Sequence, residues 1–255
     1  MKEQILRKLK EFETNNKVEV LLAVESGSRG WGFASVDSDY DVRFVYKYPT
    51  EMYLGLQKPQ DCYAWTDGEL DFEGFDIYKF FDLLLKSNMN IIDWLFQTGE
   101  NVYVDKLKNK SGLQKCVLDY FNHQTYISHN YGLCAKNFKQ YFENPKAGEP
   151  NVKRYIYCIR AIASARYCSH YKTIAPLDFN KLIKKIFAQE DIADIDEMIL
   201  IKNQSEHGEY QNEKWVDYIQ SSLTQSHPKA EENDPKTYEV LLNQILQGEL
   251  KEVKT

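Results

Sequence analysis

Residues 25–43 read "ESGSRGWGFASVDSDYDVR". Three glycines lie close together in the first half of this stretch, and three aspartates then stand at alternate positions. Glycines allow the backbone to turn sharply, whereas neighbouring carboxylates repel one another. Neither feature adds much to the stability of a fold, so the stretch predicts a binding site for an anion and its metal ions.

Two predicted strands flank this stretch. "KVEVLLAVES" precedes the glycines and is short, β-branched and apolar in its middle, which is typical of a buried strand that ends near Glu25. "DYDVRFVYKY" follows and alternates in polarity, which predicts a second strand beginning at Asp39. The glycine-rich turn therefore connects the end of one strand to the acidic start of the next.

The acidic start of the second strand suits a metal ion. Because side chains alternate along a strand, Asp39, Asp41 and Arg43 project on one side. Two carboxylates about 7 Å apart on one face repel unless a cation lies between them, and Mg²⁺ prefers a few carboxylates together with phosphates and water. A solvated acidic edge strand is the alternative. A calcium-binding loop is excluded, since Val42 stands where that loop needs glycine and Tyr48 where it needs glutamate.

The glycine-rich turn runs from Gly27 to Gly32 and suits a phosphate. Glycines allow successive amides to point into one concavity, and Ser28 adds a hydroxyl donor. No G-K-[ST] follows, so the turn is not a Walker loop, and its spacing is not that of a dinucleotide fold. The alternative is a glycine-rich turn that binds no ligand.

The two features together resemble the DNA polymerase beta superfamily of nucleotidyltransferases. In that superfamily a G-S turn holds the triphosphate, and D-x-D carboxylates on the next strand hold two Mg²⁺ ions. The residues of this chain that match the pattern are Gly27, Ser28, Asp39 and Asp41. The resemblance implies the same nucleotidyltransferase fold, with a mixed sheet.

A closer resemblance is to nucleotidyltransferases of the RlaP/YcgL type, which are associated with RNA repair. The motifs that carry it are "GSRGWGF", "SDYDVRF", "DIYKF", "LLLKSN" and "DWLF". One departure is Gly30, where alanine is usual. The resemblance covers at least residues 20–97 and continues more weakly into "KRYIYCIRAIASARY".

The resemblance also implies a third acid on a neighbouring strand, which binds metal and assists the attacking hydroxyl. Asp71, Glu73 and Asp76 compete for this role. Asp76 is preferred because it belongs to the matching D-x-x-K segment, and a bulge at Gly74 would bring it beside the other acids. Its alternative role is to cap the helix that follows. Lys79 then either meets a phosphate or lies on the surface of that helix.

Two arginines near the turn are expected to neutralise the triphosphate. Arg29 lies in the turn, and Arg43 shares the face of the two aspartates. The planar guanidinium suits phosphate. The alternative for Arg43 is an ion pair with Asp41 in the resting site, and both roles are compatible at different times.

A third group of cofactor-binding residues is predicted far along the chain. Lys153, Tyr157 and Arg160 recur at i, i+4 and i+7, so they share one face of a helix. This stripe is expected to close over the nucleotide, with the ring on the base and the cations on the phosphates. The alternative is a solvated helix face with an extended lysine stem.

The remaining pattern predicts an α+β protein with two domains. Further strands are expected at 62–66, 69–77 and 100–105, and helices at 3–14, in "YKFFDLLLKS", in "IIDWLFQT" and at 151–171. A break is expected at 144–150, and polar gaps near 203–213 and 225–235. The predicted architecture is a mixed-sheet catalytic domain at 1–110, followed by an all-helical domain at 111–255 that closes over the site.

Composition limits the partners. The net charge is −6 and the isoelectric point about 5.5, so any contact with nucleic acid should be local, as at an RNA end. Five scattered cysteines without a C-x-x-C pair argue against zinc and favour a cytoplasmic location. The beginning of the chain predicts an amphipathic helix rather than a signal peptide, and no apolar run is long enough to cross a membrane.

The expected reaction moves a nucleoside monophosphate from ATP or another nucleoside triphosphate to a hydroxyl, with Mg²⁺ or Mn²⁺ as cofactor. Asp39 and Asp41 are expected to bridge the ions, Asp76 to help activate the hydroxyl and Ser28 to hold the phosphates. An RNA end is the favoured acceptor. Nucleotidylation of a small molecule or a protein, and a non-catalytic nucleotide-binding or regulatory module, are the alternatives.

Overall fold

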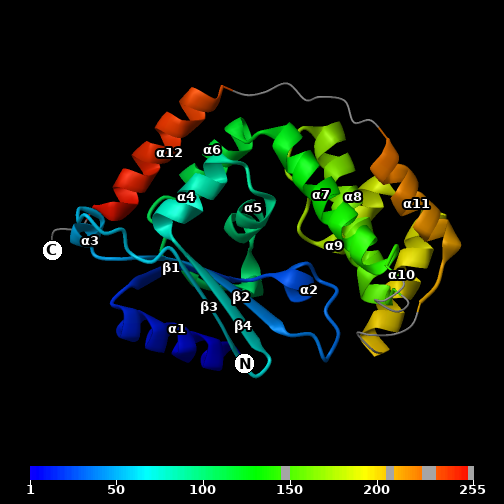
Figure 1. Ribbon diagram of the computed structural model, residues 1–255, viewed down its shortest axis with the longest axis horizontal. Coiled ribbons are helices and arrows are strands. Elements are labelled where there is room, and N and C mark those ends of the chain that lie inside the picture. Colours follow the sequence, from blue (N-terminus) through cyan, green and yellow to red (C-terminus); the bar gives the residue numbers. More distant parts are fainter. Residues whose placement is uncertain (145–149, 205–209, 226–233, 252–255) are drawn as a thin grey trace. The chain divides into compact units, whose positions relative to one another are not determined.

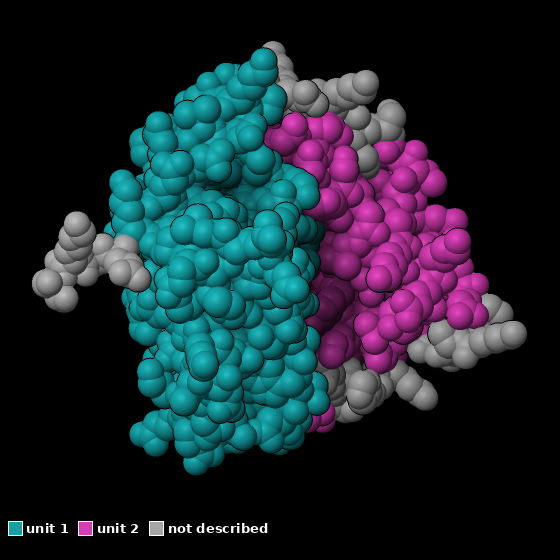
Figure 2. Space-filling view, turned by 60° about the vertical axis from the view of Figure 1, so that its left-hand side comes forward, with its two compact units in different colours: residues 1–30, 39–121, 233–255 teal, residues 31–38, 122–232 magenta. Residues whose placement is uncertain are grey.

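The computed structural model describes residues 1–144, 150–204, 210–225 and 234–251. The chain divides into two compact units, which Figure 2 shows in different colours. Unit 1 comprises Met1–Gly30, Asp39–Phe121 and Asn233–Thr255, and unit 2 comprises Trp31–Ser38 and Asn122–Glu232.

Unit 1 is built on a five-stranded mixed sheet with the order β3-β4-β2-β1-β5. The strands are β1 (Glu19–Glu25), β2 (Tyr40–Lys47), β3 (Cys62–Asp67), β4 (Leu70–Asp76) and β5 (Val102–Asp105). β2 and β4 run parallel, and the other neighbouring pairs are antiparallel. All five strands were predicted from the sequence, and the mixed sheet with its helices confirms the α+β class.

One face of the sheet is covered by α1 (Lys2–Asn16), as Figure 1 shows. Ile5, Leu9 and Phe12 are the buried residues of this helix, at the spacing that predicted it. The ring of Phe12 lies 4.9 Å from that of Phe44 and stacks at 5.3 Å on that of Trp65. This aromatic packing fixes which side chains of β2 and β3 point into the core, and therefore which point to the opposite face.

The opposite face is only partly covered. α4 (Ile77–Leu85) and α5 (Met89–Phe96) lie on it in Figure 1, and Phe75 of β4 stacks on Trp94 of α5 at 5.0 Å. Unit 1 also contains α2 (Gly27–Gly30), α3 (Thr50–Tyr53), a 3₁₀ turn at Gly99–Asn101 and α6 (Lys110–Tyr120). Beyond Phe75, the middle of β4 and the start of β2 keep partly exposed side chains, and these form the candidate site.

β4 contains no bulge at Gly74. β2 and β4 pair without interruption from Tyr40 opposite Leu70 to Tyr46 opposite Asp76. An added Cβ at Gly74 would lie 2.2 Å from the ring of Phe44, so glycine is needed there for close packing. The predicted bulge was wrong, because a glycine in a strand marks a close approach as readily as a bulge.

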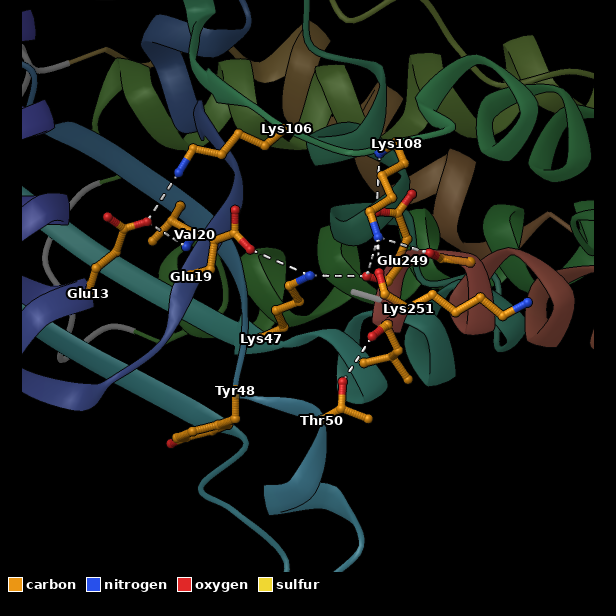
Figure 3. Close-up of polar contacts among 12 residues, drawn as sticks. Glu13, Glu19, Val20, Lys47, Tyr48, Thr50, Lys106, Lys108, Glu249 and Lys251 are labelled. Atoms are coloured by element: carbon orange, nitrogen blue, oxygen red, sulfur yellow. Dashed lines mark hydrogen bonds and ion pairs between the residues drawn. The ribbon is translucent and has the colours of Figure 1, made fainter. Parts of the chain in front are cut away.

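The last helix of the described chain, α12 (Pro235–Leu250), returns to unit 1. Its Tyr238 hydroxyl donates to the carbonyl of Leu84 on α4 at 2.9 Å. Near its end, the buried carboxylate of Glu249 accepts the backbone N–H of Lys108 (Figure 3) and the backbone N–H of Asn109, both at 3.1 Å. Polar contacts therefore attach both ends of α12 to unit 1.

Unit 2 is helical. Its helices are α7 (His123–Tyr141), α8 (Val152–Tyr171), α9 (Phe179–Ile186), α10 (Gln189–Gln204) and α11 (Glu213–Thr224). α8 is buried on most of its surface, and Trp31 and Phe33 belong to the same core. Among the residues that the structure describes, no helix is long and apolar enough to span a membrane.

The two units differ from the predicted domains, which were divided between residues 110 and 111. Residues 31–38 belong to unit 2 although they lie between two strands of unit 1, and α12 belongs to unit 1 although it follows the helical unit. The reason is that contacts rather than chain order define a compact unit, and α12 packs on α4 and α6.

Some predictions concern residues outside the described part of the chain. The predicted break at 144–150 falls mostly on 145–149, and the polar gaps near 203–213 and 225–235 include 205–209 and 226–233. These predictions therefore stay predictions.

Candidate active site

The glycine-rich turn lies directly against the acidic start of β2. The N–H of Ser26 donates to the carbonyl of Asp41 at 2.9 Å. Gly27 has a φ of 57°, and an added Cβ there would lie 1.9 Å from Oδ2 of Asp41. Only glycine meets both conditions, because the left-handed backbone and the close carboxylate exclude a side chain. The structure thus brings the two sequence motifs together through Gly27 and Asp41.

Glu25 is a site residue that the sequence interpretation missed. It ends β1, it is 3% exposed, and its Oε1 accepts the N–H of Asp41 at 2.9 Å. Its other oxygen accepts the hydroxyl of Tyr103 on β5. Burial raises the pKa of Glu25, although these two hydrogen bonds oppose the shift. One feature of the sequence could have identified Glu25. It is an acid at the end of a largely apolar strand, and a carboxylate buried there needs hydrogen-bond donors.

Two strands present a row of charged side chains on the partly exposed face. The parallel register places Asp41 directly opposite Asp71, and Arg43 directly opposite Glu73. On the outer strand β3, Thr66 pairs with Asp71 in the same cross-strand row. Directly paired side chains on one face are close neighbours, so Asp41 and Asp71 form an acid pair across the two strands.

Arg43 connects this acid pair. Its Nη2 donates to Oδ1 of Asp41 at 2.7 Å and to Oδ2 of Asp71 at 2.8 Å. Its Nη1 donates to the carbonyl of Asp71 at 2.9 Å, and its Nε lies 3.8 Å from Oε2 of Glu73. From the sequence, Arg43 was expected to bind phosphate, with an ion pair to Asp41 as the alternative. In the structure, Arg43 forms that ion pair.

Asp76 does not reach the acid pair. It pairs with Tyr46, which belongs to the face covered by α1, and it is buried at the far end of β4. Its carboxylate accepts the N–H of Tyr78 at 2.9 Å and the hydroxyl of Tyr53 at 2.6 Å, so it caps α4. The choice of Asp76 as third carboxylate disagrees with this geometry, because the bulge that it required is absent.

Asp39, Ser28 and Arg29 lie around the turn. Asp39 stands immediately before β2 and is exposed, while Ser28 lies in α2 and is only 4% exposed. Arg29 donates from Nε to the carbonyl of Asp39 at 3.2 Å, and its guanidinium lies 3.8 Å above the ring of Tyr40. These residues are neighbours of the acid pair along the chain, and their roles toward a ligand stay predictions.

Lys79 lies at the other end of β4. It forms an ion pair with Asp61 at 3.3 Å and lies 4.7 Å from the centre of the Phe75 ring. Together with Tyr53 and Asp76 it lines a pocket of about 430 Å³. This pocket is at the end of the strand opposite to Asp71, so the structure does not bring Lys79 to the acid pair.

The stripe on α8 packs against the segment that follows the turn. Arg160 is buried, with its guanidinium 3.6 Å from the centre of the Trp31 ring. Tyr157 meets the rings of Trp31 at 5.5 Å and Phe33 at 6.1 Å, and Lys153 lies 5.9 Å from the centre of the Tyr157 ring. The three residues share a helix face as predicted, but Arg160 is used in packing inside unit 2.

The donor set limits the kind of metal site that the chain can form. Within the described ranges, no group of three or more His, Cys, Asp or Glu side chains is arranged to hold a metal ion. Two carboxylate oxygens, from Asp41 and Asp71, do converge on one nitrogen of Arg43. This pair fits a cation such as Mg²⁺, which is commonly held by one or two carboxylates together with substrate phosphates and water.

Comparisons with known proteins agree with the sequence motifs. The family RlaP, described as "RNA repair pathway DNA polymerase beta family", matches residues 1–247. An uncharacterized protein YcgL from Bacillus subtilis (strain 168) is 32% identical over 193 residues, which is 75% of this chain and 72% of that protein.

A solved structure of a nucleotidyltransferase-like protein from Exiguobacterium sibiricum 255-15 aligns with 97% of this chain and 75% of its own. Its sequence identity is 11% and its TM-score 0.32, values too low to carry an argument. The family match covers nearly the whole chain and includes both motifs of the candidate site. The chain therefore belongs to the RlaP family, the RNA repair pathway branch of the DNA polymerase beta nucleotidyltransferases.

Proposed function

We propose that the protein transfers a nucleoside monophosphate from a nucleoside triphosphate to a hydroxyl group, with an RNA end as acceptor. The observation that supports this most is the acid pair. Asp41 and Asp71 lie opposite each other on parallel strands, and the backbone of Gly27 lies against Asp41. A turn for phosphates beside converging carboxylates is the arrangement that transfer of a nucleotide needs.

In the proposed reaction, the acceptor oxygen forms a bond to the α-phosphorus. The bond from that phosphorus to the bridging oxygen of the β-phosphate breaks, and pyrophosphate leaves. The hydroxyl proton passes to a carboxylate of the site, for which Asp71 is the proposed residue in place of Asp76. Mg²⁺ or Mn²⁺ held by the acid pair, together with phosphate oxygens and water, would neutralise the charge that develops on the phosphate oxygens, and Asp39 is proposed as a further ligand from the residue before β2.

The other residues bind and orient the substrate in this proposal. The first N–H groups of a helical turn have no carbonyl partner within the turn, so those at Gly27 and Ser28 suit the β- and γ-phosphates. Arg29 supplies positive charge from the same turn. Glu25 holds the backbone of Asp41 in place through its N–H, at 2.9 Å. Lys153 and Tyr157 remain proposed contacts to the nucleotide.

A cytoplasmic location is part of the proposal. All five cysteines are free thiols, and four of them are buried. Buried free cysteines behave as small apolar residues and persist where thiols stay reduced.

A non-catalytic nucleotide-binding module is the second candidate function. Two observations favour it: no described group of three acids is arranged for metal, and Arg43 engages both members of the acid pair. Such a module would bind a triphosphate without breaking it.

The test uses each nucleoside triphosphate labelled at the α-phosphate, Mg²⁺ or Mn²⁺, and a mixture of RNAs. We expect label on RNA that carries a free 3′ hydroxyl, and none on periodate-oxidised RNA, which lacks that hydroxyl. Asp41→Asn should reduce transfer by about 100-fold or more. Asp217→Asn, which changes an exposed residue on α11, should leave transfer intact.

Three outcomes decide between the candidates. Transfer that depends on Asp41 supports the enzyme. Saturable binding of the triphosphate without transfer to any acceptor supports the module. Transfer to protein or to small molecules, with RNA left unlabelled, overturns the RNA acceptor and keeps the chemistry.

A further inference from the structure

Arg43 occupies the point at which the acid pair converges. A single nitrogen, Nη2, lies 2.7 Å from Oδ1 of Asp41 and 2.8 Å from Oδ2 of Asp71. The side chain of Arg43 is 15% exposed, against 28% for Asp41 and 41% for Asp71. The guanidinium is thus the most buried member of the group, and the carboxylates reach it from either side.

The rest of the guanidinium is held by the strands. Nη1 donates to the carbonyls of Asp71 at 2.9 Å and Val42 at 3.4 Å. Nε faces Glu73 at 3.8 Å. Arginine is suited to this position, because its planar group offers several donors in fixed directions. The contact is therefore a built arrangement that uses three nitrogens, and not a loose surface ion pair.

Three carboxylates lie around the guanidinium of Arg43. Asp41 and Asp71 each accept a hydrogen bond from its Nη2, and Oε2 of Glu73 lies 3.8 Å from its Nε. Carboxylates that share a site repel each other unless a positive group lies between them. Arg43 supplies that group, and its Nη2 lies where the oxygens of both carboxylates converge.

We infer that Arg43 is the resident counter-ion of the acid pair, and that a divalent cation must displace it. This inference rests on the proposed function, because it assumes that Asp41 and Asp71 are the metal-binding acids. Metal alone then binds weakly, since it competes with the guanidinium for the same oxygens. A triphosphate changes the balance, because its oxygens offer the displaced guanidinium a new bidentate partner.

Metal and triphosphate consequently assist each other. Binding of one lowers the free energy that binding of the other requires, since the metal releases Arg43 from the acids and the phosphates accept it. The device keeps a positive group between the two acids until metal and substrate bind together. It also explains why an arginine, rather than an apolar residue, faces the same side as the two acids.

The test is the affinity of the full-length protein for Mn²⁺ without nucleotide, measured by electron paramagnetic resonance. Arg43→Gln removes the competing charge and should tighten Mn²⁺ binding by about tenfold or more. Lys47→Gln is a matched control on the same strand: its side chain is 17% exposed and pairs with Glu19, away from the acid pair. Its Mn²⁺ affinity should stay within about twofold of the wild type.

A second measurement, of triphosphate affinity, should change in the opposite direction. Binding of a non-hydrolysable triphosphate in the presence of metal should weaken in Arg43→Gln, because the phosphates lose their bidentate partner. Should Arg43→Gln fail to fold, Arg43→Lys carries the test. Lysine keeps the charge but cannot hold both carboxylates and the Asp71 carbonyl with one planar group, so Mn²⁺ should still bind several-fold more tightly.

The outcomes separate this inference from the proposed function. If both Arg43 variants bind Mn²⁺ no more tightly than the wild type, the inference is overturned. Loss of Mn²⁺ binding in Asp41→Asn would in that case still support the proposed metal site. Mn²⁺ binding that is unchanged in Asp41→Asn and Asp71→Asn overturns both. Tighter Mn²⁺ binding together with weaker triphosphate binding supports the inference.

Discussion

At the scale of single residues, two aspartates of β4 have different tasks. Asp71 lies on the partly exposed face and binds Arg43, whereas Asp76 is buried and caps α4. Burial raises the pKa of Asp76, and the hydrogen bonds from Tyr53 and from the Tyr78 N–H oppose that shift. A carboxyl with a raised pKa is held more favourably in its protonated form by the folded chain than by the unfolded one.

This shift predicts how stability depends on pH. The contribution of Asp76 is present below about pH 4, the ordinary range for a carboxyl group, and is lost as the pH rises through its raised pKa. Wild type should therefore lose stability relative to Asp76→Asn between acidic and neutral pH. Urea unfolding of both proteins across this range measures the difference.

A second variant sharpens that prediction. Tyr53→Phe removes a hydrogen bond that favours the ionised form of Asp76, so the decline should continue to higher pH and become larger in total. A difference between wild type and Asp76→Asn that does not change with pH would contradict the assignment of a raised pKa.

The sequence predicted part of the site at this scale. The spacing of Gly27 and Asp41 identified residues that lie against each other. Gly27 follows the end of β1 and Asp41 lies near the start of β2, and one connection joins these two antiparallel strands. The sequence interpretation preferred Asp76 to Asp71 as the third acid, whereas the register places Asp71 opposite Asp41. The choice between them depends on the parallel pairing of β2 with β4, which no local pattern in either strand encodes.

At the scale of elements, one glycine sets the register between two strands. Gly74 lies opposite Phe44, and an added Cβ would lie 2.2 Å from the Phe44 ring. The ring packs between α1 and the sheet, so it has no free space to move into. This contact keeps β4 in the alignment that places Asp71 beside Asp41.

Gly74→Ala should destabilise the fold by about 1–3 kcal/mol, because a methyl group there overpacks the core. Phe44→Leu should offset part of this loss in the double variant, and thermal unfolding of the four proteins gives the coupling free energy. Gly248→Ala is the control: apart from its chain neighbours and the backbone of its own helix, no described atom lies within 4 Å of its added Cβ, and helix propensity predicts a gain of up to about 1 kcal/mol. Additive losses at positions 44 and 74 would argue against the close packing.

At the scale of the whole molecule, the order of the chain and the compact units differ. Composition changes where the strands end, and this change gave the predicted boundary between residues 110 and 111. The final helix α12 nevertheless packs on unit 1, where Lys108 and Lys47 donate to carbonyls at its end (Figure 3). Cations stabilise the C-terminal end of a helix, and this long-range pairing has no local signal in the sequence.

Glu249→Gln tests how much this attachment contributes. The Glu249 carboxylate is 2% exposed and accepts two backbone N–H groups just before α6, whereas glutamine offers one oxygen. We expect a loss of about 1–3 kcal/mol in the free energy of unfolding, with faster hydrogen exchange in α12. Glu239→Gln, an exposed change on the same helix, should stay within about 0.5 kcal/mol of the wild type. Equal exchange in both variants would show that the Glu249 carboxylate contributes little to the attachment of α12.

The most direct test of the account compares three aspartates in one assay of label transfer from an α-labelled triphosphate. Asp41→Asn and Asp71→Asn should each lower the rate by about 100-fold or more, while folded Asp76→Asn should stay within a few-fold of the wild type. An active Asp71→Asn together with a folded but inactive Asp76→Asn would contradict the assignment of the acid pair.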